Sequence, residues 1–262
     1  MIVHKKNNNY LVFVGSGRTG STLVGQLLNK HPNIAISSEL RVLTNALKKN
    51  RKVKKYLKKI EKVSLSETRV PHKYKNDELN EQFKTWQKDW KTPDKEIIYK
   101  YPKKEIYLYG DKKQGGNTEA FIEDENKVFE LLDGLNLKFF SIVRHPYSVL
   151  NSYKQVGYEL NSYIDKYIKI QKKSLDLIEE QCGLIVYYEE LLSNPEKVLN
   201  SMFNFLNVEF DTDFISDVRQ IINTGKNIKN ESIPENLKKK VDSELPGLIE
   251  NYKNLNEQQH LN

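Results

Sequence analysis

The sequence predicts an α/β fold, organised as a single domain in which a central parallel sheet is flanked by helices. Residues 10–14 (YLVFV) form a short apolar run that is typical of a buried parallel strand. A glycine-rich turn, GSGRTG, follows at once, and a helix with an apolar face begins at Ser21. Further apolar runs then alternate with amphipathic segments along the chain, which is typical of a doubly wound sheet.

The stretch at residues 15–22, GSGRTGST, has the composition of a phosphate-binding loop. Its glycines let the backbone curl so that several N–H groups point inward, and the N-terminus of the following helix adds positive potential. The spacing resembles the GxxxxGK[ST] loop of nucleotide triphosphatases, but Ser21 stands where that loop has lysine. Arg18 supplies a fixed charge instead, and Ser21 and Thr22 add hydroxyl donors. A plain strand-to-helix turn is the alternative, and the flanking strand and helix favour the phosphate site.

Composition bounds the class of protein. A chain of 262 residues with 38% hydrophobic residues suits one sizeable α/β domain. No apolar run reaches the length of a signal peptide or a membrane span, so we expect a cytoplasmic location. The single cysteine, Cys182, excludes an internal disulfide, and we expect its side chain to be buried or half-buried. The net charge of +7 suits an anionic ligand without implying nucleic acid.

A second short strand is predicted at residues 34–36, followed by SSELR at residues 37–41. Ligands of open α/β sheets lie at the carboxyl ends of strands, so we expect Glu39 and Arg41 beside the phosphate loop. A carboxylate repels an anionic ligand unless it has a task, and proton abstraction is the natural one. The alternative, in which Glu39 caps a helix or pairs with Arg41, stays open.

Residues 42–104 are expected to form a helical insertion on the side of the acceptor. One long helix, or two helices broken near Asn50, is predicted over residues 43–63, and another helix over residues 77–90 carries Phe83, Trp86 and Trp90. Lysines and arginines crowd one face of the 43–63 segment. A solvated face is the main interpretation, and a docking surface for an acidic acceptor is the alternative.

Two further strand ends are expected to supply polar groups. A strand over residues 105–109 leads into the turn GDKKQGG at 110–116, which puts Asp111 and Lys112 on the ligand side. A strand over residues 138–143 leads into RHPY, where Pro146 favours the first turn of a helix. Arg144 at that strand exit and Ser152 two helical turns later are expected to converge on a second phosphate.

The remaining elements follow in alternation. Helices are predicted over residues 119–132, 161–181, 211–223 and 234–255, and a strand over residues 183–188. A further helix is predicted to begin within residues 189–196 and to include the apolar positions from Val198 to Leu206. His145, which precedes a proline, is expected to be a structural turn residue and not a base.

Together these motifs resemble those of the sulfotransferase family, which uses 3′-phosphoadenosine-5′-phosphosulfate (PAPS) as donor. The loop at residues 15–22 is similar to the family's 5′-phosphosulfate loop, commonly PRSGTT or PKSGTT. The segment IVRHPYSVLNS at residues 142–152 resembles its 3′-phosphate motif, with Arg144 and Ser152 in the binding positions. VYYEELLSNP at residues 186–195 resembles the RYEDL…P segment, which places Tyr188 near the nucleotide. The resemblance spans residues 10–210 and implies a P-loop nucleotide-hydrolase-like fold.

The resemblance also implies roles for individual residues. It is greatest with the protein-tyrosine and related bacterial branch, where Glu39 matches a catalytic glutamate and Arg41 a supporting, substrate-binding arginine. Lys112, in the segment GDK, matches a lysine that assists the leaving group. Nucleotide contacts are implied for Gly17, Arg18, Thr19, Gly20, Ser21, Thr22, Arg144, Ser152, Tyr188 and, in the loop at 225–227, Lys226.

The implied reaction is in-line transfer of a sulfuryl group from PAPS to a hydroxyl or amine of an acceptor, leaving 3′-phosphoadenosine-5′-phosphate (PAP). Glu39 would accept the proton, and Arg18 and Lys112 would neutralise the growing charge, so no metal is required. A small-molecule, carbohydrate, lipid or peptide acceptor is expected, with an acidic one slightly favoured. No nucleic-acid partner is expected, and the oligomeric state stays open. Two alternatives remain: a P-loop kinase or related nucleotide hydrolase, and an anion-binding module built on the lysine-rich helix.

Overall fold

The computed structural model describes residues 9–65, 104–210, 212–222 and 233–251. The chain divides into two compact units. The first unit comprises Met1–Phe13 and Thr22–Lys138, and the second comprises Val14–Ser21 and Phe139–Asn262. The helix predicted over residues 77–90 and the loop that carries Lys226 lie outside the described residues. A single domain therefore stays a prediction.

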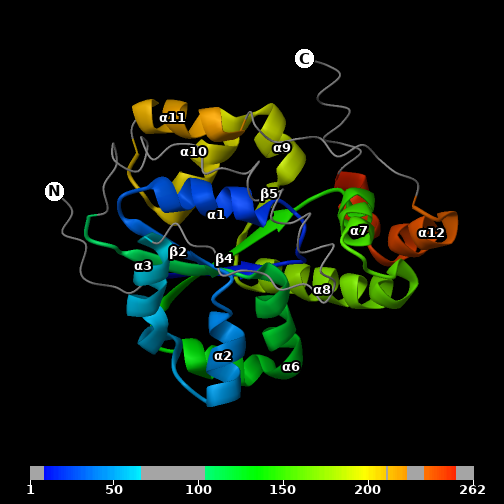
Figure 1. The fold of residues 1–262 in the computed structure, drawn as a ribbon, viewed down its shortest axis with the longest axis horizontal. Helices are drawn as coiled ribbons and strands as arrows, with labels where there is room; N and C mark the ends of the chain where they lie inside the picture. Colours follow the sequence, from blue (N-terminus) through cyan, green and yellow to red (C-terminus); the bar gives the residue numbers. More distant parts are fainter. Residues whose placement is uncertain (1–8, 66–103, 211, 223–232, 252–262) are drawn as a thin grey trace. The chain divides into compact units, whose positions relative to one another are not determined.

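Five strands form one sheet with the order β2-β3-β1-β4-β5. In the first unit, β3 (Leu108–Lys112) pairs in parallel with β1 (Asn9–Val14) and with β2 (Ile34–Ser38). In the second unit, β4 (Asn136–Val143) pairs in parallel with β5 (Leu184–Tyr187). The predicted α/β class, with a parallel sheet flanked by helices, is confirmed (Figure 1).

The helices of the first unit cover its strands and each other. The chain forms α1 (Ser21–Lys30), α2 (Val42–Lys49), the short 3₁₀ helix η1 (Val53–Tyr56), α3 (Leu57–Leu65) and α6 (Gln114–Leu132). Helix α3 packs against β2 and β3, and α2 packs against α6, as Figure 1 shows. Asn50 ends α2 in a left-handed conformation with φ 44°, so the break predicted near this residue is confirmed.

Strand β3 lies three residues later than the sequence predicts. The reason is Gly110, which was interpreted as the start of a turn and instead lies inside the strand. A Cβ atom on Gly110 would come within 2.9 Å of Ile36 Cδ1 and 3.1 Å of the Leu11 carbonyl oxygen. Glycine is therefore required here for close packing of strands, and Asp111 and Lys112 are the last two residues of β3.

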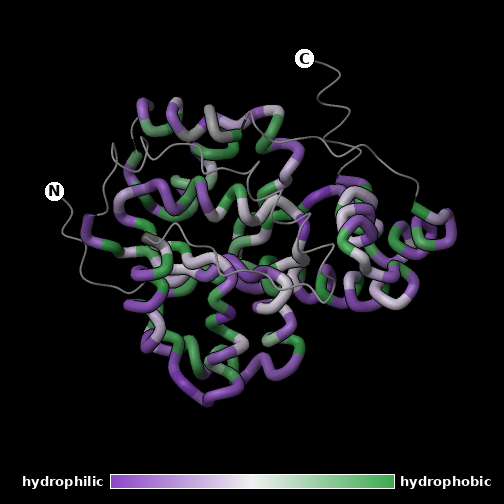
Figure 2. The backbone as a smooth tube through the Cα atoms, viewed as in Figure 1, coloured by the Kyte–Doolittle hydropathy of each residue, from purple (hydrophilic) through white to green (hydrophobic). Residues whose placement is uncertain are grey.

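The described part of the second unit also contains several helices. Among them are α7 (Pro146–Gln155), α8 (Leu160–Glu180), α9 (Tyr188–Ser193), α10 (Pro195–Leu206), α11 (Thr212–Ile222) and α12 (Glu235–Glu244). Helix α8 packs against α7 and α12, while α10 packs against β5, α9 and α11. Hydrophobic and hydrophilic residues alternate along α11 and α12, as the amphipathic pattern predicts (Figure 2).

Two expectations about the second unit are wrong. The helix predicted over residues 234–255 is interrupted at Leu245. Helix α12 ends at Glu244, because Pro246 disfavours helical backbone in the residue that precedes it, and helical backbone resumes over residues 246–251. Cys182 is exposed, because it lies in the turn that ends α8 and has a left-handed φ of 48°. Of the helices that the structure describes, none is sufficiently long and apolar to span a membrane.

Candidate functional site

The glycine-rich loop curls through three residues with positive φ. Gly15, Arg18 and Gly20 have φ values of 124°, 65° and 91°. Glycine adopts this region without strain, whereas arginine in a left-handed conformation costs roughly 1–2 kcal/mol. The Thr19 hydroxyl donates to the carbonyl oxygen of Ser16 at 3.5 Å inside the loop. Strain at the one charged residue of the loop indicates that its surroundings fix its position.

Arg18 bonds to the helix that carries the predicted 3′-phosphate serine. Its Nε donates to Ser152 Oγ at 2.9 Å, and Ser152 lies on α7 with 2% of its surface exposed. Both residues belong to the second unit. Nε of Arg18 is the donor in this hydrogen bond, and the two terminal nitrogens of its guanidinium group take no part in it. The sequence predicts separate phosphates for Arg18 and Ser152, and no local pattern indicates that their side chains are in contact.

Arg144 follows directly on β4 and is 8% exposed. Its guanidinium carbon lies 4.9 Å from the ring centre of Tyr188, which is a cation–π distance. Its Nε is buried and has no hydrogen-bond partner among the described residues. Native structures rarely leave a buried charged donor unsatisfied, so this nitrogen fits an anionic ligand.

Tyr188 also approaches the glycine-rich loop. A Cβ atom on Gly20 would lie 2.2 Å from Tyr188 Cδ2, so this position accepts only glycine. Burial raises the pKa of Tyr188, and the Arg144 charge opposes that rise. The second unit thus brings together five predicted site residues, namely Arg18, Gly20, Arg144, Ser152 and Tyr188.

His145 has the structural role that the sequence predicts. Its Nδ1 accepts a hydrogen bond from the backbone N–H of Tyr147 at 3.3 Å, which caps α7. Its own backbone N–H donates to Glu189 Oε1 at 3.0 Å. Burial lowers the pKa of His145, and the Asp242 carboxylate opposes that change. Nδ1 of His145 can accept this hydrogen bond only when it carries no proton, so the lowered pKa favours the form of the ring that caps the helix.

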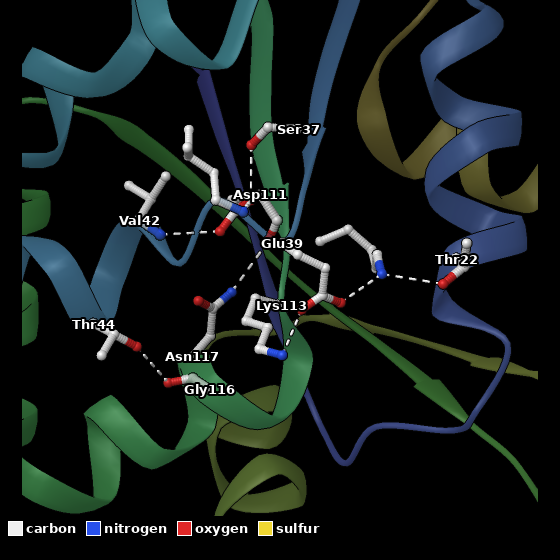
Figure 3. A network of polar contacts seen from close by, with 11 residues as sticks. Thr22, Ser37, Glu39, Val42, Thr44, Asp111, Lys113, Gly116 and Asn117 are labelled. Carbon is white, nitrogen blue, oxygen red and sulfur yellow. Dashed lines mark hydrogen bonds and ion pairs between the residues drawn. The ribbon is translucent and has the colours of Figure 1, made fainter. Parts of the chain in front are cut away.

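In the first unit, Glu39 lies between two lysines. Lys112 Nζ donates to Glu39 Oε1 at 2.7 Å and to Thr22 Oγ1 at 3.1 Å. Lys113 forms an ion pair with Glu39 Oε2, which Figure 3 shows from close by. Lys112 is 5% exposed, and burial lowers its pKa while the charge of Glu39 opposes this. Three predicted site residues, Thr22, Glu39 and Lys112, are therefore joined in one chain of contacts.

Asp111 holds the segment that presents Glu39. This carboxylate is fully buried and accepts from Ser37 Oγ at 2.7 Å, from Leu40 N at 2.9 Å and from Val42 N at 3.0 Å (Figure 3). Burial raises the pKa of Asp111, and the three hydrogen bonds oppose that rise. Because both oxygens are engaged inside the protein, Asp111 is a positioning residue. The sequence around Asp111 does not indicate this role, because its hydrogen-bond partners are about 70 positions away in the chain.

Arg41 is exposed and precedes α2 with φ 56°. Glu39 also has a positive φ of 63°. The two residues that flank Leu40 therefore both have a strained, left-handed backbone conformation. The ion pairs of Glu39 run to Lys112 and Lys113, and the first N–H of α2, that of Val42, bonds to Asp111. Neither the Arg41 pair nor the helix cap that the sequence left open is therefore the observed arrangement.

The remaining predicted site residues have simpler positions. Gly17 is half-buried against Tyr153, and Thr19 is buried in the loop. Ser21 is the first residue of α1 and is 8% exposed. Lys226 lies outside the described residues. Sequence reasoning missed Lys113 and Gln171: only the repeated lysine in GDKK hinted at the first, and a lone glutamine on the apolar face of α8 hinted at the second.

The fold is α/β, and the two clusters contain arginine, lysine and a glycine-rich loop. The model of the sulfotransferase family matches residues 11–212, and the chain belongs to this family. The predicted class of enzyme, a PAPS-dependent sulfotransferase, is thereby confirmed, and the kinase alternative is set aside. A comparison with curated protein sequences finds no match.

Several solved structures are similar at low identity. The sulfotransferase domain from the curacin biosynthetic pathway is 16% identical, with a TM-score of 0.49 and coverage of 92% of this chain and 98% of that chain. Sulfotransferase STF9 from Mycobacterium avium is 13% identical, with a TM-score of 0.48 and coverage of 96% and 77%. Mouse sulfotransferase SULT7A1 complexed with PAP is 10% identical, with a TM-score of 0.48 and coverage of 98% and 90%. Likeness at this level assigns neither an acceptor nor catalytic residues.

Proposed function

We propose that this chain transfers the sulfuryl group of PAPS to a hydroxyl or amine of an acceptor, with Glu39 as the base and PAP as the product. The observation that carries the proposal is the bridge that Lys112 makes between Glu39 and Thr22. It joins a carboxylate, a cation and a hydroxyl from the start of α1 in one hydrogen-bonded chain. A carboxylate can accept the acceptor's proton in such a transfer, and a cation and a hydroxyl can stabilise charge that develops at the leaving oxygen.

The donor is assigned to the cluster in the second unit. Arg144 and Ser152 bind the 3′-phosphate, and the buried Nε of Arg144 supports this because it has no partner among the described residues. The 5′-phosphosulfate lies on the loop, held by Arg18 and by backbone N–H groups near the start of α1. Tyr188, beside Arg144 and Gly20, contacts the nucleotide.

In the transfer step, the acceptor oxygen or nitrogen attacks sulfur as the bond from sulfur to the bridging oxygen breaks. The electron pair of that bond leaves with the 5′-phosphate of PAP, and the acceptor proton moves to Glu39. Lys112 is suited to the leaving oxygen because an ammonium has three donors, of which Glu39 and Thr22 engage two. Arg18 adds a second cation, so the mechanism needs no metal for charge neutralisation.

The acceptor is assigned to the side of Glu39 that Arg41 borders. Arg41 is exposed, and the segment after it, through α2 and α3, carries many exposed lysines. An acidic acceptor, as a carbohydrate, lipid, small molecule or peptide, fits this charge. Within the family, the motifs around Glu39 and Lys112 favour the protein-tyrosine and related bacterial branch.

Isothermal titration tests the donor assignment. We expect PAP to bind without Mg²⁺, and ATP with Mg²⁺ to bind far more weakly. Absence of PAP binding, or tighter Mg²⁺-dependent binding of ATP, would contradict the proposal. An acceptor screen with radiolabelled PAPS and a mass readout then identifies the sulfated product, with Glu39→Gln protein as the control for transfer that does not depend on the base.

A further inference from the structure

The first half of the glycine-rich loop is bonded to a buried glutamine far along the chain. The backbone N–H of Ser16 donates to Gln171 Oε1 at 3.2 Å, across 155 residues of sequence. Gln171 lies in the middle of α8 and is 1% exposed, on a face whose other residues are mostly apolar. Burying an amide is unfavourable unless it is hydrogen-bonded, so the bond to Ser16 accounts for a polar residue at this position.

The next residue of the loop is held by a tyrosine. The hydroxyl of Tyr153, at the end of α7, lies against Gly17, where a Cβ atom would come within 2.7 Å of it. Burial raises the pKa of Tyr153, and hydrogen bonds from Tyr163 and from the backbone of Gly17 oppose that rise. The Tyr153 ring packs on Tyr163 and Tyr158 with centroid distances of 4.3 Å and 5.0 Å, which fixes the hydroxyl in place.

Side chains from α7 and α8 therefore contact two successive residues of the loop: Gln171 accepts from the Ser16 N–H, and the Tyr153 hydroxyl lies against Gly17. Ser16 and Gly17 directly precede Arg18, whose left-handed backbone requires support from its surroundings. A loop that is already fixed in its binding shape does not have to be ordered when the ligand binds. The ligand therefore binds more tightly than it would to a mobile loop.

We propose that Gln171 and Tyr153 are positioning residues that hold the loop, and with it Arg18, in the shape that binds the 5′-phosphosulfate of the donor. This inference rests on the proposed function, because it takes PAPS as the ligand of the loop. It assigns a role in donor binding to two side chains that themselves need not touch the donor.

Two variants and two probes test the inference. Gln171→Leu removes the acceptor for Ser16 and nearly keeps the volume, and Tyr153→Phe removes only a hydroxyl. The probes are PAP and 3′-AMP, which lacks the 5′-phosphate, and both affinities are measured by titration. We expect Gln171→Leu to weaken PAP binding by about tenfold and Tyr153→Phe to weaken it by a smaller factor. The affinity of both variants for 3′-AMP is expected to stay within about twofold of the wild-type value.

Matched variants separate positioning from folding. Gln171→Asn keeps an amide acceptor on a side chain one methylene shorter, and it is expected to weaken PAP binding less than Gln171→Leu does. Ser174→Ala changes an equally buried residue of α8 whose hydroxyl bonds to the Gln171 carbonyl within the helix, and it is expected to leave both affinities unchanged. In steady-state assays, Gln171→Leu is expected to raise KM for PAPS by more than it lowers kcat.

An equal loss of affinity for PAP and 3′-AMP would overturn the inference, as would a lower Tm with unchanged PAP affinity. If Gln171→Leu does not fold, the contrast between the two probes is read from Tyr153→Phe. Failure of the wild-type chain to bind PAP would overturn the proposed function itself, whereas PAP binding that neither variant changes would overturn this inference alone.

Discussion

Arg18 and Ser152 are joined by a hydrogen bond of 2.9 Å between Nε and Oγ, although 134 residues separate them in the sequence. One belongs to the loop that we assign to the 5′-phosphosulfate, and the other to the helix that we assign to the 3′-phosphate. The serine hydroxyl accepts this bond and still has its own hydrogen to donate. Within the second unit, this hydrogen bond therefore ties the glycine-rich loop to helix α7.

Arg144→Ala tests the 3′-phosphate assignment. Removing a buried guanidinium that bonds to a charged group is expected to weaken PAP binding by about 1.5–3 kcal/mol. Binding of adenosine-5′-phosphosulfate, which lacks the 3′-phosphate, is expected to change little. Titration with both ligands measures the contrast. Arg219→Ala, which removes the same charge from an exposed site of the second unit, is the control. Equal losses for both ligands would show that Arg144 acts through the fold.

Glu39→Gln tests the base. A general base typically contributes about 10²–10⁴-fold to the rate, so we expect turnover to fall by that order. Glutamine keeps the shape without the charge, and donor affinity is therefore expected to stay the same or improve slightly. Single-turnover rate, PAP affinity and Tm are measured on one preparation.

A structural role for Glu39 would give a different result. The ion pairs with Lys112 and Lys113 would then be its main contribution, and their loss would lower Tm. A stable Glu39→Gln protein that binds the donor and turns over nearly as fast as wild type would remove Glu39 from the mechanism.

The two lysines on Glu39 are expected to differ in their effect on catalysis. The side chain of Lys112 is 7% exposed and also bonds to Thr22, whereas the side chain of Lys113 is 23% exposed and its ion pair is with Glu39. We expect Lys112→Met to lower kcat by about 10²-fold or more, because it removes the cation at the leaving oxygen. Lys113→Met is expected to stay within about fivefold of wild type, since partly exposed ion pairs contribute little. Stopped assays at saturating PAPS measure both, and equal losses would contradict the assignment of Lys112.

His145 makes stability depend on pH. Burial lowers its pKa from the ordinary 6.5, so the unfolded chain takes up the proton first as the pH falls. The free energy of unfolding is therefore expected to decrease as the pH falls below 6.5, until the lowered pKa is passed. Protonation also removes the acceptor for the Tyr147 N–H.

The variant His145→Asn isolates this effect. Asparagine can cap α7 but does not titrate. The free energy of unfolding of the variant is therefore expected to fall less steeply between about pH 6.5 and pH 5 than that of the wild-type chain. Urea unfolding at a series of pH values measures the two slopes. Identical slopes for wild type and variant would show that His145 does not contribute to acid sensitivity.

The fold was predictable because its signals are local. The apolar run before the loop, the glycines of the loop and the proline of α7 each follow from the residues that carry them. Strand β3 was misplaced for the opposite reason. Gly110 is typical of a turn by itself, and only the packing of Ile36 and Leu11 against it requires glycine inside a strand. A local pattern cannot show which neighbours a glycine meets.

The sequence singled out Arg18, Arg144 and Glu39 by their charge and their place at strand ends or in the loop, and the structure places each of them in one of the two clusters. Their partners were not predictable, because ion pairs and hydrogen bonds depend on which segments the fold brings together. Lys113 binds Glu39 across 74 positions, and Gln171 binds Ser16 across 155. Whether these residues act in catalysis as assigned stays a prediction that the variants above address.

Asp111 has a consequence for the interpretation of mutational screens. Its carboxylate is buried, and its three hydrogen bonds fix the short segment on which Glu39 and Arg41 both have positive φ. Asp111→Ala would release that segment and leave two backbone N–H groups without an acceptor. A screen that reads activity alone would score such a variant as severely as Glu39→Ala. Asp111, one position before the proposed catalytic lysine, would then be mistaken for a residue that takes part in proton transfer. Its hydrogen bonds instead hold the backbone segment that carries Glu39.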